Sequence, residues 1–308
     1  MAPLIRSSRL RPGARVAVVA PSGPVPADRL EEGLGTLRDW GLEPVVAPHV
    51  LHVHPELDYL AGADADRAAD LQAAWCDPSV DAVFCARGGY GAHRMVDLVD
   101  WAAIRDAGPK VFVGYSDITA LHEAFALRAG FATLHGPMVA TEAFLKDAAT
   151  REHLRATLFE PEKVLTLGLD TATALIPGRA HGILYGGCVS LLAAATGTPH
   201  ARGGLLVIED TGEEPYRLDG ILTRLLRSGA LEGVSGVVCG SWQECGPYEK
   251  IRAVLADRLG PLGIPVIEEL GFGHGPTALT VPLGVPAVLD APADGGRCTL
   301  TAEVPALL

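Results

Sequence analysis

The chain has 308 residues, a formal net charge of −12 and 48% hydrophobic residues. A protein of this length buries a large core and is expected to form two domains. The excess of acidic residues argues against nucleic acid or an anionic membrane as a partner, although a local arginine cluster can still bind a small anion.

The sequence carries no pattern for secretion or for crossing a membrane. Arg6, Arg9 and Arg11 interrupt the apolar stretch that a signal peptide needs. No apolar run approaches the roughly 18 residues that span a bilayer. The six cysteines are scattered without a CxxC pair, which is typical of reduced thiols rather than of disulfides or a zinc site. We therefore expect a cytoplasmic protein.

The first half of the chain alternates strand and helix patterns. Apolar runs at 14–20, 44–47, 80–85 and 111–113 predict strands, and residues 28–40, 64–75 and 90–101 predict helices. Continuous apolar strands between helices are typical of a parallel sheet covered on both faces. Ligands of such sheets bind beyond the carboxyl ends of the strands. The turns at 21–24, 86–91 and 114–117 are expected at that edge.

The second half has a different pattern. The polar, turn-rich stretch 143–180 is interpreted as a connection between an N-terminal domain, residues 1–142, and a C-terminal domain, residues 181–308. Strands are predicted at 182–185, 204–208, 233–239 and 265–268, and a helix at 218–228. Short β segments at 280–282, 287–290 and 297–301 close the chain.

The junction around Ser116 is the most informative segment. An apolar strand ends at Val113, and a helical pattern follows with Ile118, Leu121 and Phe125 along one face. A tight strand-to-helix turn exposes its serine at the sheet edge and points unpaired helix N–H groups to the same place. Such a turn presents the nucleophile in many serine hydrolases. The alternative is that the serine and the aspartate after it only cap the helix.

A serine nucleophile needs a general base. His135 and His274 both lie in Gly/Pro-rich loops after apolar segments, where a loop can hold an imidazole at a sheet edge. His122 follows Ser116 on the same predicted helix and points about 240° away from it. The remaining histidines are expected in loops, on the surface or in packing positions: His49, His52, His54, His93, His153, His181 and His200.

The base in turn needs a carboxylate that orients it. Glu209 ends an apolar strand, which directs its side chain to the same edge of the sheet. Asp210, Glu213 and Glu214 follow as rivals, although Glu213 and Glu214 fit a solvated loop better.

These motifs together resemble the LD-carboxypeptidase family of serine peptidases, which includes muramoyltetrapeptide carboxypeptidases and hydrolases that inactivate microcin C. The resemblance runs nearly end to end and is carried by residues 20–23, 59–62, 86–91, 109–110, 114–121, 134–138, 197–198, 208–210, 216–219 and 271–276. Relatives often have Asn where this chain has Cys188, a change that bears on substrate preference and leaves the other motifs intact.

The resemblance implies a Ser–Glu–His triad of Ser116, Glu209 and His274. It also implies an oxyanion hole from the backbone of Gly88, Gly89 and Asp117, with His135 as a structural residue. The implied fold is an α/β N-terminal domain with a parallel sheet and a β-rich α/β C-terminal domain. The active site would lie in the cleft between them, commonly in a homodimer, without metal or other cofactor.

The implied reaction releases D-Ala from a murein tetrapeptide, a small peptide substrate. Arg87 and Arg217 are candidates for binding its terminal carboxylate, because a guanidinium binds carboxylates bidentately. Tyr90 is a further substrate-binding candidate. Capping or surface ion pairs explain either arginine equally well.

Two alternatives remain open from the sequence. A hydrolase of the microcin C type would cut a peptidyl-nucleotide, and Trp242 is the candidate platform for the base, although packing explains this residue better. A noncatalytic ligand-binding protein would hold a small molecule with the same turns and would not react with a fluorophosphonate.

Overall fold

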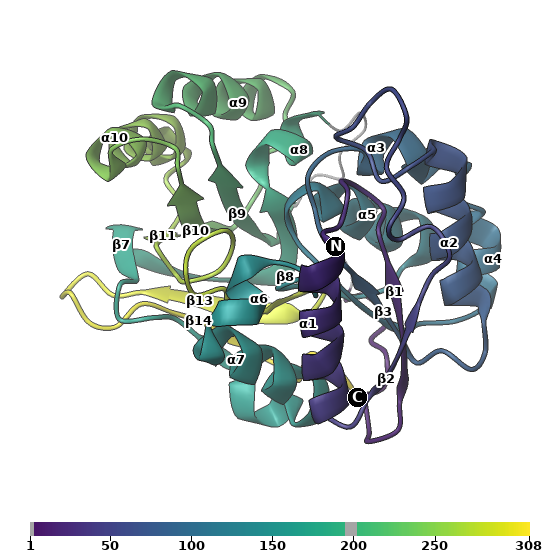
Figure 1. The fold of residues 1–308 in the computed structure, drawn as a ribbon. Helices are drawn as coiled ribbons and strands as arrows, with labels where there is room; N and C mark the ends of the chain where they lie inside the picture. The colour runs from purple at the N-terminus through teal and green to yellow at the C-terminus, as the bar shows by residue number, and fades with distance from the viewer. Residues whose placement is uncertain (1–2, 195–201) are drawn as a thin grey trace.

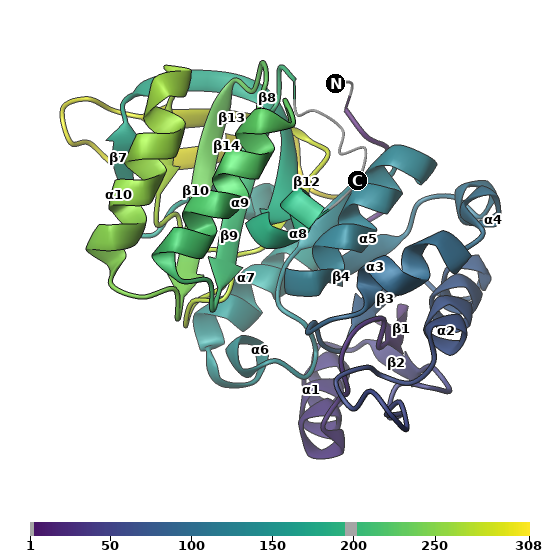
Figure 2. The ribbon, with the colours of Figure 1, turned by 90° about the horizontal axis from the view of Figure 1, so that it is seen from above.

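The computed structural model describes residues 3–194 and 202–308. Two β-sheets lie beside each other, each with helices against it (Figures 1 and 2). The motif at 197–198 and His200 lie outside the described residues. Within the described residues, no helix is both long and apolar enough to cross a membrane.

The first sheet has six strands in the order β12-β5-β4-β3-β1-β2. Strands β1 to β5 run parallel to one another, and the edge strand β12 is antiparallel to its neighbour β5. The strands are β1 (Arg15–Val19), β2 (Glu43–Val46), β3 (Ala82–Cys85), β4 (Val111–Gly114), β5 (Thr133–His135) and β12 (Val281–Leu283). The parallel sheet predicted from the first half of the chain is confirmed.

Helices cover both faces of this sheet. One apolar core packs α1 (Ala27–Asp39), α6 (Glu142–Lys146) and α7 (Ala148–Phe159) against it. The other core packs α2 (Asp64–Cys76), α3 (Ala92–Met95), α4 (Trp101–Asp106) and α5 (Thr119–Ala124). The helix predicted at 90–101 is divided, because Asp100 accepts hydrogen bonds from the N–H groups of Ala102 and Ala103 and so begins α4.

The second sheet has eight strands in the order β6-β14-β13-β8-β9-β10-β11-β7. Three helices cover one face, and Figure 2 shows two of them, α9 and α10, lying across β9 and β10. The strands are β6 (Thr166–Leu167), β7 (Thr173–Ile176), β8 (Gly178–Cys188), β9 (Leu205–Thr211), β10 (Gly236–Gln243), β11 (Val266–Glu268), β13 (Pro286–Ala291) and β14 (Thr299–Ala302). The helices are α8 (Val189–Ala194), α9 (Pro215–Arg227) and α10 (Tyr248–Leu259).

The segment 143–180 is more than the connection that the sequence indicated. It contains most of α6 and all of α7, and it contributes β6 and β7 to opposite edges of the second sheet. Its polar residues misled the prediction, because two of them are buried in α7. Thr150 is fully buried and its Oγ1 accepts a hydrogen bond from the N–H of Ala278, while Thr157 is bonded to the carbonyl of His153.

Candidate active site

Ser116 occupies a strained turn between β4 and α5. Its φ angle is +65°, in the left-handed region that non-glycine residues rarely adopt. Such a conformation costs on the order of 1–3 kcal/mol and is concentrated at functional sites. The chain leaves β4 at Gly114 and enters a short 3₁₀ turn, Ser116–Ile118, that leads into α5. The turn has the geometry predicted for an exposed nucleophile, and Ser116 is half-buried.

Gly88 brings a second turn against this serine. A methyl group on Gly88 would lie 2.9 Å from Cβ and 3.1 Å from Oγ of Ser116, so only glycine allows this approach. The turn follows β3, and the Gly88 carbonyl accepts a hydrogen bond of 3.0 Å from the N–H of Gly23, in the turn after β1. The turns after β1, β3 and β4 therefore meet at one edge of the sheet, as the sequence predicted.

The side chain of Asp117 holds these three turns together. Its Oδ2 accepts hydrogen bonds from the hydroxyl of Ser22, at 2.6 Å, and from the N–H of Ala92, at 2.8 Å. Burial raises the pKa of Asp117, although the two hydrogen bonds counteract part of that rise. The carboxylate of Asp117 thus has a structural role. The backbone N–H of Asp117 lies at the start of the 3₁₀ turn beside Ser116.

Glu209, on the second sheet, and His274, in the loop between β11 and β12, form a largely buried pair. Oε2 of Glu209, on β9, lies 2.5 Å from Nδ1 of His274, and the two side chains are 0% and 15% exposed. Gly273 makes the pair possible. It has a φ angle of +98°, and a Cβ there would lie 2.6 Å from the same carboxylate oxygen.

The pair is electrostatically coupled. Burial raises the pKa of Glu209, but the nearby imidazoles of His274 and His135 outweigh burial and hold it at about 2. Burial lowers the pKa of His274, but the charge of Glu209 and its hydrogen bond outweigh that effect and raise the pKa above the ordinary 6.5. Glu209 is therefore an anion that makes His274 a stronger base.

Tyr115 links this pair to the serine turn. The ring centroid of Tyr115, the residue before Ser116, lies 4.8 Å from that of His274 and 6.0 Å from that of His135. The structure thus brings Ser116, Glu209 and His274 to the junction of the two sheets.

A second histidine at the carboxylate was not predicted. Nε2 of His135 lies 3.7 Å from Oε1 of Glu209, so the carboxylate lies between two imidazoles. His135 ends β5 and is 1% exposed, and its ring nitrogens have no hydrogen-bond partner among the described residues. His122 faces elsewhere, as expected, since its Nε2 lies 2.9 Å from the Gly114 carbonyl and burial lowers its pKa to about 3.

Asp210, the rival of Glu209, has a different position. Its Oδ2 accepts the N–H of Ser190 at 2.8 Å, and its Oδ1 accepts a hydrogen bond from the thiol of Cys188 at 3.2 Å. The N–H of Cys188 in turn bonds to Oγ1 of Thr119, on α5, at 2.9 Å. Cys188 and Asp210 thus join β8, α8 and α5 beside the site.

The substrate-binding candidates occupy varied surroundings. Arg87 is exposed and donates to the carbonyl of Pro24, so it braces the turn after β1. Tyr90 is 55% exposed and packs edge-on against Tyr59. Arg217 is exposed on α9, 3.8 Å from Glu213.

Trp242 is 8% exposed within the core of the second sheet, and its indole N–H has no partner among the described residues. A ring in this position presents little surface for stacking on a base.

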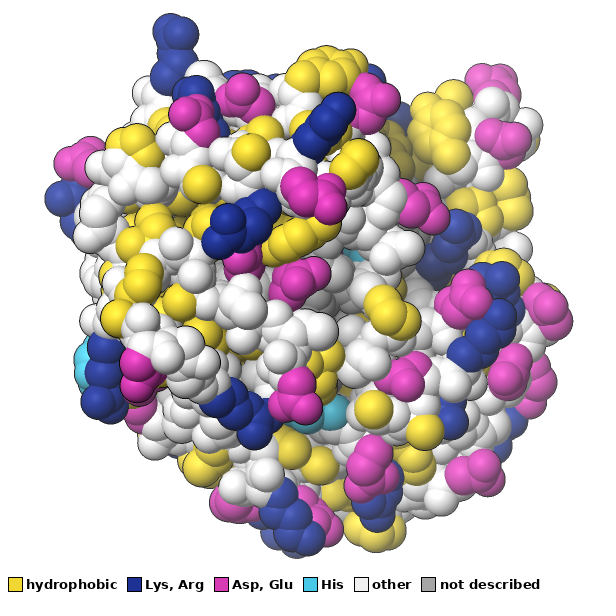
Figure 3. Space-filling model, turned by 90° about the vertical axis from the view of Figure 1, so that its left-hand side faces the viewer, with side chains coloured by type: hydrophobic (Ala, Val, Ile, Leu, Met, Phe, Trp, Pro, Cys, Tyr) yellow, Lys and Arg dark blue, Asp and Glu magenta, His cyan; other side chains and the backbone are white. Residues whose placement is uncertain are grey.

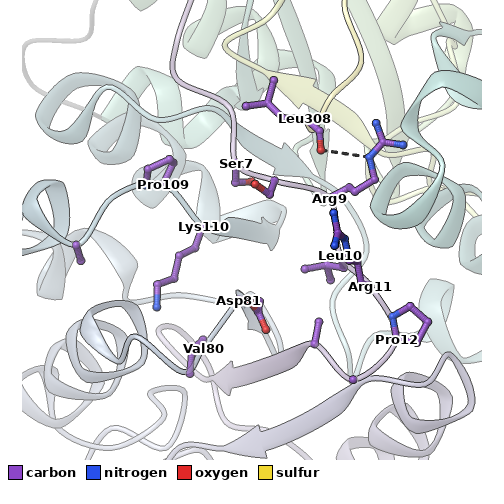
Figure 4. Close-up of a pocket in the computed structure, with 14 residues that line it drawn as sticks. Ser7, Arg9, Leu10, Arg11, Pro12, Val80, Asp81, Pro109, Lys110 and Leu308 are labelled. Atoms are coloured by element: carbon purple, nitrogen blue, oxygen red, sulfur yellow. Dashed lines mark hydrogen bonds between the residues drawn. The ribbon is translucent and has the colours of Figure 1, made fainter.

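A pocket of about 780 Å³ lies at the opposite edge of the first sheet. Its lining includes residues just before β1, β3 and β4, among them Ala14, Asp81 and Lys110 (Figure 4). These are the amino ends of the strands, whereas Ser116 follows the carboxyl end of β4. Lys110 is also occupied there, since it donates to the carbonyl of Asp77. The pocket is therefore separate from the candidate active site.

One face of the molecule carries charges of both signs (Figure 3). On the face shown in Figure 3, basic and acidic side chains are interspersed with apolar ones rather than gathered by sign. That nucleic acid is not a partner stays a prediction from the composition.

Comparison with known proteins identifies the family. Residues 16–136 match the LD-carboxypeptidase N-terminal domain, and residues 181–289 match the LD-carboxypeptidase C-terminal domain. A putative carboxypeptidase of Streptomyces coelicolor is 66% identical over 100% of this chain and 99% of its own length. A murein tetrapeptide carboxypeptidase of Pseudomonas aeruginosa is 32% identical over 90% of this chain and 93% of its own.

Solved structures show the same architecture. A muramoyltetrapeptide carboxypeptidase from Oxalobacter formigenes superposes with a TM-score of 0.81 at 30% identity, covering 95% of this chain and 100% of that one. An MccF-like protein from Bacillus anthracis has a TM-score of 0.84 at 23% identity, over 97% and 99% of the two chains, and shares the fold. The chain belongs to the LD-carboxypeptidase family of peptidases.

Proposed function

We propose that this protein is a serine LD-carboxypeptidase that removes the terminal D-Ala from murein tetrapeptides, with Ser116, His274 and Glu209 as its triad. The observation that carries the proposal is the buried Glu209–His274 pair against Tyr115, next to a serine held at positive φ. The names of the relatives in Pseudomonas aeruginosa and Oxalobacter formigenes support the substrate.

In the proposed reaction Ser116 attacks the carbonyl carbon of the amide that precedes D-Ala. Nδ1 of His274 faces Glu209, so Nε2 takes the proton of the serine hydroxyl. The anion of Glu209 stabilises the imidazolium that forms. His274 then gives the proton to the leaving amine of D-Ala, and an acyl-enzyme remains. Water activated by His274 releases the shortened peptide and restores Ser116.

The backbone N–H groups of Gly88, Gly89 and Asp117 are the proposed oxyanion hole. The close approach of Gly88 to Ser116 supports this role, because a donor must lie about 3 Å from the developing oxyanion. The side chain of Asp117 would fix the donors in place through Ser22 and Ala92.

The remaining roles stay proposals of the same kind. Arg87 and Arg217 both stay candidates for the terminal carboxylate of the substrate, since each is exposed and each already has one neighbour, the Pro24 carbonyl and Glu213 respectively. Tyr90 is exposed in the turn that carries Gly88 and is proposed to contact the peptide. We also propose a cytoplasmic location, which a role in recycling murein peptides implies, and a homodimer, which the family resemblance implies.

The test compares the purified protein with its Ser116→Ala variant on a murein tetrapeptide, with D-Ala followed by mass spectrometry. We expect release by the unmodified protein alone. Fluorophosphonate labelling of Ser116 without D-Ala release would retain the triad and reject the substrate, and AMP release from a peptidyl-nucleotide would then favour the microcin C type of reaction. If the protein shows neither D-Ala release nor labelling, the proposal of a serine hydrolase is rejected.

A further inference from the structure

The loop after β2 brings together two histidines and an aspartate. Among the described residues, one ligand atom each from His49, His52 and Asp66 lies within 4.8 Å of the other two. His49 and His52 belong to the loop, and Asp66 belongs to the first half of α2. We propose that these three side chains bind a divalent transition-metal ion of the zinc type. This site is separate from the proposed triad and takes no part in its chemistry.

One histidine of the cluster, His49, is already oriented for such a role. Nδ1 of His49 lies 2.7 Å from Oδ1 of Asp70, and the backbone N–H of His49 donates to Oδ2 of the same carboxylate at 2.9 Å. Asp70 is only 5% exposed. Metal-binding histidines commonly hold their second ring nitrogen in this way against a carboxylate, which fixes the ring and increases its basicity. Nε2 of His49 is the atom left for the metal.

The donor set fits a particular class of metal. Two imidazole nitrogens and one carboxylate oxygen suit zinc and its first-row neighbours better than calcium or magnesium, which prefer oxygen ligands. Zinc–ligand bonds of about 2.0–2.1 Å put tetrahedral ligands about 3.3 Å apart, so the ligand atoms must approach one another by at most about 1.5 Å. His52 is exposed, and its ring already lies 4.9 Å from that of His49, so a side-chain rotation can supply this movement.

The metal would fasten a loop that borders the catalytic turns. The same loop continues to Tyr59, which packs against Tyr90, and to Ala61, whose N–H donates to the carbonyl of Ser22. Both Tyr90 and Ser22 belong to turns that meet at Ser116. A metal bound at His49, His52 and Asp66 would therefore hold this loop against α2. A protease such as chymotrypsin should then cleave the loop more slowly.

The test titrates tag-free protein with Zn²⁺ in competition with a chromophoric chelator, at a pH of about 8 because metal ligands bind in their deprotonated form. We expect one Zn²⁺ per chain. His52→Ala and Asp66→Ala should each weaken binding at least tenfold, and Asp70→Asn should weaken it about 10- to 100-fold through the orientation of His49. His181→Ala is the matched control, because His181 is 60% exposed and lies away from the cluster beside Glu303.

A second measurement follows cleavage of the loop by chymotrypsin with and without Zn²⁺. We expect Zn²⁺ to slow cleavage at Leu51 and Tyr59, both exposed, in the unmodified protein and not in the His52→Ala variant. Circular dichroism and thermal unfolding check that each variant is folded. The proposal would be overturned if the protein bound no stoichiometric Zn²⁺. It would also be overturned if the folded His52→Ala and Asp66→Ala variants bound Zn²⁺ as tightly as the unmodified protein. Neither measurement uses a peptide substrate, so the result is independent of the proposed function.

Discussion

Replacing Gly88 with alanine tests the proposed site more sharply than removing the nucleophile does. The added methyl group would lie 2.9 Å from Cβ and 3.1 Å from Oγ of Ser116, and 3.3 Å from the methyl carbon of Met138. Gly88 does not have a positive φ angle of the kind found at Gly89 and Gly91. The substitution therefore introduces a local collision rather than backbone strain.

The size of the effect follows from that collision. Ordinary contacts begin near 3.4 Å, so the turn at Gly88 or the serine must move by about 0.5 Å or more. A misplacement of about 1 Å costs a reaction about 10²-fold, and loss of one oxyanion donor costs about 10²–10³-fold. We expect kcat/KM to fall by about 10²–10³-fold, which corresponds to about 2.7–4 kcal/mol. Overpacking should lower stability by only about 1–3 kcal/mol.

The assay measures D-Ala release from a murein tetrapeptide, with chemical denaturation of each variant alongside. Gly35→Ala is the matched control, because Gly35 lies in α1 and a Cβ there has no neighbour within 4 Å. It should keep full activity and gain about 0.5–1 kcal/mol of stability. A folded Gly88→Ala variant with unchanged kcat/KM would refute the placement of this turn beside the reacting atoms.

Three further results are expected. Glu209→Gln removes the charge that raises the pKa of His274, so kcat should fall and the acidic limb of the kcat/KM profile should move from above pH 6.5 to a lower pH. An acidic limb that stays in place would contradict the pairing of Glu209 with His274. Asp117→Ala should cost about 1–3 kcal/mol for each buried donor left unpaired, measured by denaturant unfolding, and a loss below 1 kcal/mol would contradict the bracing role. Burial raises the pKa of Glu123 from 4.5 to about 7. Between these two pH values the folded state binds a proton that the unfolded state has lost, so the free energy of unfolding should fall by up to about 3 kcal/mol as the pH rises from 4.5 to about 7. Glu123→Gln should remove this fall, and unfolding measured at several pH values decides the point.

The parallel sheet and the three turns of the candidate site could be predicted because each depends on a local sequence pattern. Continuous apolar strands, each followed by a Gly-rich turn, require only the rule that parallel strands present their carboxyl ends together. Glu209 was assigned by the same rule, from its expected place at the end of an apolar run, although β9 continues to Thr211. The contact between Gly88 and Ser116 follows from β3 and β4 being neighbours.

What the sequence did not indicate depends on contacts between distant segments. The approach of His135 to Glu209 joins β5 of one sheet to β9 of the other, and no local pattern encodes that distance. The cluster of His49, His52 and Asp66 likewise forms only when the loop after β2 folds against α2. The helix α7 was missed because its threonines, polar in the sequence, are buried and hydrogen-bonded in the fold.

The loop that carries His274 is fastened to both sheets, which bears on whether the site can open. On one side, Oγ of Ser241, at the end of the second sheet, accepts the N–H of Gly275, and the N–H of Ser241 donates to the carbonyl of Phe272. On the other side, the chain continues into β12, which pairs with β5 in the first sheet so that Val281 lies opposite His135. His274 lies within the first anchor, between Phe272 and Gly275, and β12 follows it after a short segment, so a hinge between the sheets would have to stretch that segment. We therefore expect the fold itself to form the geometry of Glu209, His274 and the Ser116 turn. A bound substrate should move exposed side chains such as Tyr90 more than these three residues.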